Sequence, residues 1–165
     1  VLSRNIFIIN FQKKIIIFPI PLSNKNNRFL TMSERNFIEG GALNSFGEKF
    51  NFEGKKFESR MEYITLGTSI NYLIKHKILE IPDYIKIDVD GIEHLILEGG
   101  NKALNNDKIR SCSIEINENY KEQYLKVLDI MKKNNFEILH KKHNQDMFSG
   151  EKKFNKRFNY IFKKI

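Results

Sequence analysis

Hydrophobic residues alternate with polar ones, or recur with helical spacing, along most of the second half of the chain. These patterns predict strands at residues 84–88, 109–117, 136–140 and 158–162. Helical spacing predicts one helix with Ile92, Leu95 and Ile96 on one face. A second helix is expected to bury the face formed by Tyr120, Tyr124, Val127, Leu128 and Met131. Alternating strands and helices favour an α/β fold with a mostly parallel sheet, and the last two strands, with no helix between them, should form an antiparallel hairpin at one edge.

The first half of the chain is less regular. The apolar run at residues 15–22 predicts a strand, which should lie at a sheet edge because Pro19 and Pro21 cannot donate backbone hydrogen bonds. Residues 28–60 predict short strands and loops, and residues 63–66 predict a brief strand. Because no linker interrupts these elements, one domain is expected over residues 1–165.

Two capping signals predict where helices begin. Ser69 precedes Ile70, Leu73 and Ile74, which share one helical face. Asn119 with Glu122 three residues later resembles a capping box at the start of the long second helix.

The composition is that of a folded, water-exposed protein. The chain has 165 residues, of which 41% are hydrophobic and 29% charged, and this length buries a sizeable core without disulfides. Its single cysteine, Cys112, is expected in the core and favours a reducing compartment, so a cytoplasmic location is expected. Charged and amide residues interrupt the apolar start of the chain, which excludes a membrane span or a signal-peptide core there.

The net charge of +8 suggests an anionic partner such as nucleic acid. The lysines are scattered, however, and the densest cluster is formed by Lys152, Lys153, Lys156 and Arg157. Aromatic residues are not interleaved with the basic ones, so a nucleic-acid partner is not expected. A basic binding module for nucleic acid or an anionic glycan stays open as a non-enzymatic alternative.

The best candidate chemistry lies in KIDVDGIEH, where a strand ends and a helix begins. Asp88 is expected at the strand tip and Glu93 in the first helical turn, while Gly91 permits a tight turn or a close backbone approach. A purely structural interpretation is also open, in which Asp90 caps the helix and Glu93 supports the cap.

A second acid, Glu115, ends the next strand of the expected parallel pair. Lys86 is expected to pair with Asp88 or Glu115, because an unpaired charge inside a strand is costly. Two neighbouring strands that both end in acids predict a shared cleft. The four histidines, His76, His94, His140 and His143, have no metal-ligand spacing; they are expected on the surface, and no metal site is predicted.

These segments resemble a known family. YIKIDVDGIEHLILEGG, at residues 84–100, is similar to the signature of FkbM-type S-adenosylmethionine-dependent methyltransferases, and SCSIEIN, GGALNSF and NIFIINFQKKIIIFPIPLS are also similar to segments of that family. The resemblance implies a Rossmann-like sheet of class I methyltransferases with strand order 3-2-1-4-5-7-6. It also implies methyl transfer from S-adenosylmethionine to a hydroxyl of a sugar or secondary metabolite.

The resemblance also implies roles for individual residues. Asp88, Glu93 and Glu115 would be catalytic, with Lys86 as their counter-charge. Lys86, Asp88, Asp90, Gly91 and Ser23 would bind the cofactor. Relatives place an acid shortly after the Thr65-Leu66 step, where this chain has Gly67 and the neutral Asn71.

The glycine-rich cofactor loop and the acid-tipped second strand of the family do not precede residue 15. The chain is therefore expected to be the carboxyl-terminal part of the domain, to lack the first two strands, and to bind S-adenosylmethionine weakly or not at all. An alternative enzyme is a haloacid-dehalogenase-like phosphatase that uses Asp88 and Asp90, since IDVDG is similar to its DxDG strand end.

Overall fold

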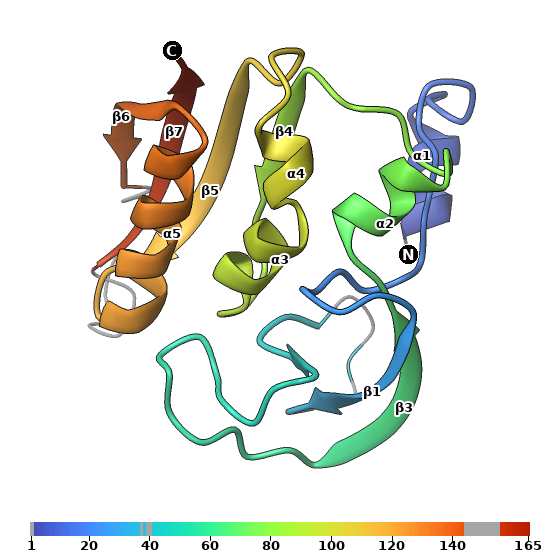
Figure 1. Cartoon of the computed structure of the whole chain (residues 1–165). Coiled ribbons are helices and arrows are strands. Elements are labelled where there is room, and N and C mark those ends of the chain that lie inside the picture. Colours follow the sequence, from blue (N-terminus) through green and yellow to red (C-terminus); the bar gives the residue numbers. More distant parts are fainter. Residues whose placement is uncertain (1, 37, 39–40, 144–155) are drawn as a thin grey trace.

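The computed structural model describes residues 2–36, 38, 41–143 and 156–165. Its elements are α1 (Leu2–Ile8), β1 (Arg28–Glu34), β2 (Ser45–Phe46), β3 (Met61–Gly67), α2 (Ile70–Lys75), β4 (Tyr84–Ile87), α3 (Glu93–Gly99), α4 (Asn101–Leu104), β5 (Ser111–Asn117), α5 (Lys121–Lys133), β6 (Phe136–Lys142) and β7 (Arg157–Lys164). Figure 1 shows two sheets, with α3, α4 and α5 in front of the larger one and α1 and α2 to one side.

The larger sheet has the strand order β4-β5-β7-β6. β4 and β5 are parallel, whereas β7 pairs antiparallel with β5 on one side and with β6 on the other. The expected antiparallel hairpin at one edge is confirmed, but the expectation of a mostly parallel sheet is wrong. The reason is the position of β7. Helices connect β4 to β5 and β5 to β6, and these three strands run in the same direction, but β7 runs in the opposite direction and inserts between β5 and β6, so only the β4–β5 pair is parallel.

The smaller sheet has the order β2-β1-β3 and is antiparallel throughout. The strand expected at residues 15–22 is absent, and only Leu22 forms an isolated bridge, with Thr68. The apolar run was therefore not sufficient to predict a strand. Pro19 and Pro21 cannot donate backbone hydrogen bonds to a neighbouring strand, and Ile16 is 93% exposed rather than buried on a sheet. The brief strand expected at residues 63–66 is the longer β3.

The hydrophobic core lies between the larger sheet and the helices that cover it. The α5 face predicted from helical spacing packs inward, with Val127 and Met131 fully buried. Ile96 and Leu97 of α3 join the same core, as does Cys112 of β5. The long helix and its buried face were therefore predicted correctly.

The two capping predictions had opposite outcomes. Ser69 caps α2, since its Oγ accepts the backbone N–H of Tyr72 at 3.1 Å. The capping box at Asn119 is wrong, because α5 begins after Tyr120 without a side-chain cap. The backbone N–H of Asn119 instead donates to the Asn117 side chain at 3.1 Å, which forms a turn before the helix. Among the described residues, no helix is both long and apolar enough to span a membrane.

Candidate functional site

The acids predicted at two strand tips lie at the same edge of the larger sheet. The parallel register of β4 and β5 ends with Ile87 opposite Ile114, so Asp88 and Glu115 follow side by side. β4 ends at Ile87, directly before Asp88, and β5 ends at Asn117, two residues after Glu115. The sequence pattern therefore located the edge correctly, because parallel strands must present their carboxyl ends together.

Lys86 pairs with Asp88 on the exposed side of this edge. Lys86 Nζ lies 2.8 Å from Asp88 Oδ2, and the two side chains are 64% and 45% exposed. The hydrogen bond and charge of Asp88 raise the pKa of Lys86. Of the two pairs suggested by the sequence, the structure has the one between Lys86 and Asp88.

The counter-charge of Glu115 is Arg157, at the start of β7. Arg157 forms an ion pair with Glu115 and lies 3.7 Å from Asp90 Oδ1. The Arg157 and Glu115 side chains are only 10% and 12% exposed. Burial raises the pKa of Glu115, and the Arg157 charge opposes that rise. In the sequence, Arg157 is notable only as part of a basic cluster. It reaches Glu115 because Arg157 pairs with Asn117 across the antiparallel strands β5 and β7, and no local sequence pattern predicts that pairing.

Glu93 is buried inside the protein rather than exposed at the cleft. Its side chain accepts a hydrogen bond from Gln123 Nε2, a residue of α5 that the sequence did not single out. The pKa of Glu93 is raised to about 8, mainly by burial; the backbone N–H groups of Glu93 and Gly91 oppose the rise, and the charges of Glu115 and Asp90 add to it. Glu93 is therefore mostly protonated at neutral pH, and its neutral carboxyl fits this buried position.

The neighbouring His94 is also buried, so its expected surface position is wrong. Its ring packs against Phe50 and Tyr120, which cover the start of α3. Its Nδ1 has no hydrogen-bond partner within the described parts of the chain. Position 94 does not belong to the apolar stripe of this helix. Its burial could not be predicted from helical spacing, because the rings that cover it come from distant segments of the chain.

Asp90 holds a loop against the strand ends instead of capping α3. Its Oδ2 accepts the backbone N–H of Leu43 at 2.5 Å, whereas α3 begins after Ile92 without a side-chain cap. Burial raises the pKa of Asp90, and the Leu43 N–H opposes that rise. The interpretation of Asp90 as a helix cap is therefore wrong, and the loop that follows residue 41 meets the KIDVDG turn here.

Gly91 permits the close approach that its position suggested. Its φ is +107°, and a Cβ built there would lie 2.8 Å from Phe52 Cα and 3.0 Å from Asn51 O. Asn117 Nδ2 donates to Phe52 O at 3.0 Å, and the Arg157 guanidinium lies 5.2 Å from the Phe52 ring centre. The loop around Phe52 therefore covers the strand ends, as the teal segment below α3 in Figure 1 shows.

Little space remains among these side chains. A cavity of about 10 Å³ is lined by Phe52, Val89, Gly91, Glu93, Glu115, Asn117, Gln123 and Arg157. This volume holds about one water molecule. Glu93, Glu115 and Gly91 are thus brought together, while Asp88 and Lys86 lie on the exposed side.

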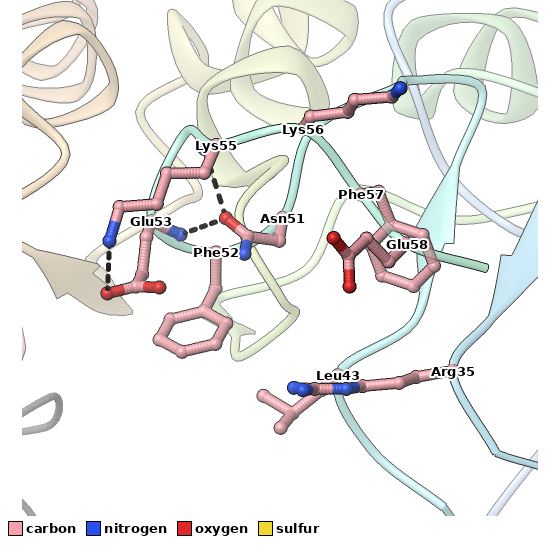
Figure 2. A pocket seen from close by; sticks show the side chains of 9 residues that line it. All are labelled: Arg35, Leu43, Asn51, Phe52, Glu53, Lys55, Lys56, Phe57 and Glu58. Atoms are coloured by element: carbon pink, nitrogen blue, oxygen red, sulfur yellow. Dashed lines mark hydrogen bonds and ion pairs between the residues drawn. The ribbon is translucent and has the colours of Figure 1, made fainter.

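A larger pocket lies on the other side of Phe52. Its volume is about 430 Å³, and it is lined by Arg35, Leu43, Asn51, Phe52, Glu53, Lys55, Lys56, Phe57 and Glu58. Figure 2 shows the Phe52 ring and the Glu58 carboxylate facing the space above Arg35 and Leu43. Asn51 Oδ1 accepts the backbone N–H groups of Glu53 and Lys55 at 2.9 and 3.1 Å, which fixes the turn of this loop. Phe52 lines both this pocket and the small cavity at the buried acids.

Ser23 lies away from the acids. Its backbone N–H donates to Thr68 O at 2.8 Å, and its carbonyl oxygen would lie 2.1 Å from a Cβ on Gly99. Gly99 ends α3, whereas Glu93 begins it. The structure thus places Ser23 at the far end of the helix from the acidic cluster.

Neither metal ligation nor a reactive thiol is indicated where the chain is described. In that part of the chain, no group of three or more histidine, cysteine or acidic side chains could hold a metal ion. Burial raises the pKa of Cys112 to about 12, so this core thiol stays protonated.

Comparison with known proteins gives one match. A family model described as the methyltransferase FkbM domain matches residues 23–138, which include both strand-end segments and the loop around Phe52. No curated protein and no solved structure matches the chain. Because the match spans well over half of the sequence, the chain belongs to the FkbM methyltransferase domain family.

Proposed function

We propose that the protein methylates a hydroxyl oxygen of a small molecule or glycan, with S-adenosylmethionine as the methyl donor. The family supports methyl transfer in general. The proposal of a hydroxyl acceptor rests mainly on one observation: Phe52 lines both the 430 Å³ pocket and the small cavity that Glu115 lines. An acceptor hydroxyl in that pocket would come within hydrogen-bond reach of Glu115 when the Phe52 side chain turns aside.

The strand order supports the same proposal. The order β4-β5-β7-β6, with β7 antiparallel, is that of the last four strands in the sheet implied by the family resemblance. In open α/β sheets, ligands bind at the carboxyl ends of the strands, which here carry Asp88 and Glu115.

The described residues fit the acceptor better than the cofactor. The 10 Å³ cavity at the acids has no room for S-adenosylmethionine, and the loop at Phe52 covers Gly91. Of the residues expected to bind the cofactor, Lys86 and Asp88 are the ones open to solvent at this edge. We therefore propose that this part of the chain forms the acceptor side of the site.

The hydroxyl must lose its proton as its oxygen forms the new bond to carbon, and we propose that Glu115 accepts that proton. S-adenosylmethionine would supply an activated methyl group when bound. Burial raises the pKa of Glu115, and the ion pair with Arg157 opposes that rise and so favours the charged form that a proton acceptor requires. Glu93, neutral at physiological pH, would position the start of α3 through Gln123. Asp88 would lie on the cofactor side with Lys86 as its counter-charge.

Radiolabel transfer from methyl-labelled S-adenosylmethionine tests this proposal. The full chain is incubated with millimolar cofactor and a panel of sugars and small hydroxylated metabolites. We expect labelled acceptor with the wild type and a rate about 100-fold lower with Glu115→Gln, the usual lower bound for losing a general base. Glu137→Gln, an exposed substitution on β6, serves as the matched control and should leave the rate unchanged.

Two results would contradict the proposal. One is the absence of transfer to every hydroxyl acceptor at millimolar cofactor. The other is equal transfer by the wild type and Glu115→Gln. No observation favours the phosphatase or the basic binding module: Asp90, which the phosphatase would need, is engaged by Leu43.

A further inference from the structure

A second groove lies between α2 and the α3–α4 pair. Its volume is about 700 Å³, which is within the range of small-molecule binding sites. Figure 1 shows α2 beside α3 and α4, and the groove also receives side chains from the loop before β1. It adjoins Gly99 at the end of α3, whereas the strand-end acids adjoin the start of that helix. The groove is therefore separate from the proposed acceptor site.

Two asparagine side chains of this groove have unused hydrogen-bonding groups. Asn26 Oδ1 accepts the Ser69 hydroxyl at 2.5 Å, which fixes the amide plane. Asn106 Oδ1 accepts the backbone N–H of Lys108 at 2.9 Å. Within the described residues, neither amide nitrogen has a hydrogen-bond acceptor, so each has two N–H groups available to a ligand.

A third amide is held beside a carboxylate. Asn24 Nδ2 donates to Glu98 Oε2 at 2.9 Å, so the second oxygen of Glu98 and the Asn24 oxygen stay available as acceptors. The groove thus offers donors and acceptors fixed by bonds to other parts of the chain. A ligand with many hydroxyl groups, each of which both donates and accepts, matches such a lining.

An aromatic ring completes the groove. Tyr72 is half-buried, and its ring lies 4.1 Å from the ring of His76, centre to centre. A flat ring beside planar amides can contact the C–H face of a sugar ring while the amides bind its hydroxyl groups. Lys75 and Lys102 also line the groove, together with the Glu98 carboxylate.

We propose that this groove binds a neutral saccharide. Besides the Lys75 and Lys102 side chains, its polar lining consists of amide, hydroxyl and carboxylate groups that together donate and accept, which matches the hydroxyl groups of a sugar. This inference does not depend on methyl transfer, since it concerns a different part of the molecule.

Titration of the ¹⁵N-labelled full chain with three neutral trisaccharides, maltotriose, cellotriose and N-acetylchitotriose, tests the inference by NMR. Side-chain amide signals of Asn26 and Asn106 report directly on the groove. We expect at least one trisaccharide to shift both signals saturably, with a millimolar dissociation constant that high salt leaves unchanged because the ligand is uncharged. The backbone signals of residues 115–117 should not move.

Substitutions separate the groove from the rest of the surface. We expect Asn26→Ala and Asn106→Ala each to weaken binding about tenfold, as the loss of a hydrogen bond predicts. Asn119→Ala, at an exposed asparagine near α5, should bind as the wild type does. Asn106 is itself exposed, so its variant tests the groove even if Asn26→Ala destabilises the fold.

Other outcomes overturn the inference. If none of the trisaccharides shifts these signals, the groove is not a saccharide site. If inorganic phosphate shifts them and the trisaccharides do not, the groove binds anions through Lys75 and Lys102.

Discussion

At the scale of single residues, the chemistry of the strand ends depends on partners that are distant in the sequence. Glu115 and Arg157 lie in different strands, and Glu93 and Gln123 in different helices. The acids themselves could be predicted, because each follows or ends a recognisable strand. Their partners could not, since the register of β7 on β5 and the packing of α5 on α3 place them there.

The buried carboxyl of Glu93 makes stability depend on pH. Burial raises the pKa of Glu93 to about 8 in the folded protein, above that of an unfolded chain. Between these two pKa values the folded state keeps a proton that the unfolded state releases, so the free energy of unfolding falls as the pH rises. Glu93→Gln removes this titration and keeps an acceptor for Gln123.

Raising the pH from about 5 to about 9 should therefore lower the free energy of unfolding of the wild type more than that of Glu93→Gln. The difference between the two losses should be on the order of a few kcal/mol. Urea unfolding of both proteins at several pH values measures the difference. Parallel stability curves for the two proteins would show that Glu93 is ionised in the folded state at neutral pH.

At the scale of elements, the helices were more predictable than the sheets. The α5 face formed by Val127 and Met131 was visible as a helical repeat, because one helix carries its own period. The segment at residues 15–22 has strand-like hydrophobicity but no partner strand among the described elements. A strand requires a neighbour, and a neighbour is a property of the whole fold rather than of the segment.

The buried face of α5 gives a prediction about stability. Met131 is fully buried, whereas Leu125 on the same helix is 60% exposed. We expect Met131→Ala to lower the free energy of unfolding by about 2–5 kcal/mol because it leaves a cavity in the core. The matched substitution Leu125→Ala should change it by less than about 1 kcal/mol, as surface changes usually do. Denaturant unfolding measures both, and equal losses would place the buried face of α5 elsewhere.

At the scale of the whole molecule, the parallel strands β4 and β5 bring their acidic tips to one edge, and a loop from the smaller sheet covers that edge. The family match spans all of these segments. The sequence predicted the meeting of Asp88 and Glu115 because the direction of both strands follows from the helical crossover between them. The sequence did not predict that the loop around Phe52 would leave only a small cavity at the two strand ends, since that depends on how the two sheets pack.

NMR titration of the full chain with S-adenosylhomocysteine, the demethylated product of the cofactor, tests whether the strand-end acids lie beside the cofactor. We expect weak, millimolar binding, with shifted backbone amides at residues 88–91 and 115–117, because the proposed cofactor side lies at these strand ends and the cavity there is too small to enclose the ligand. Micromolar affinity would contradict the proposed division between acceptor and cofactor sides. Shifts confined to segments away from the strand ends, or none at all, would contradict the assignment of these acids to methyl transfer.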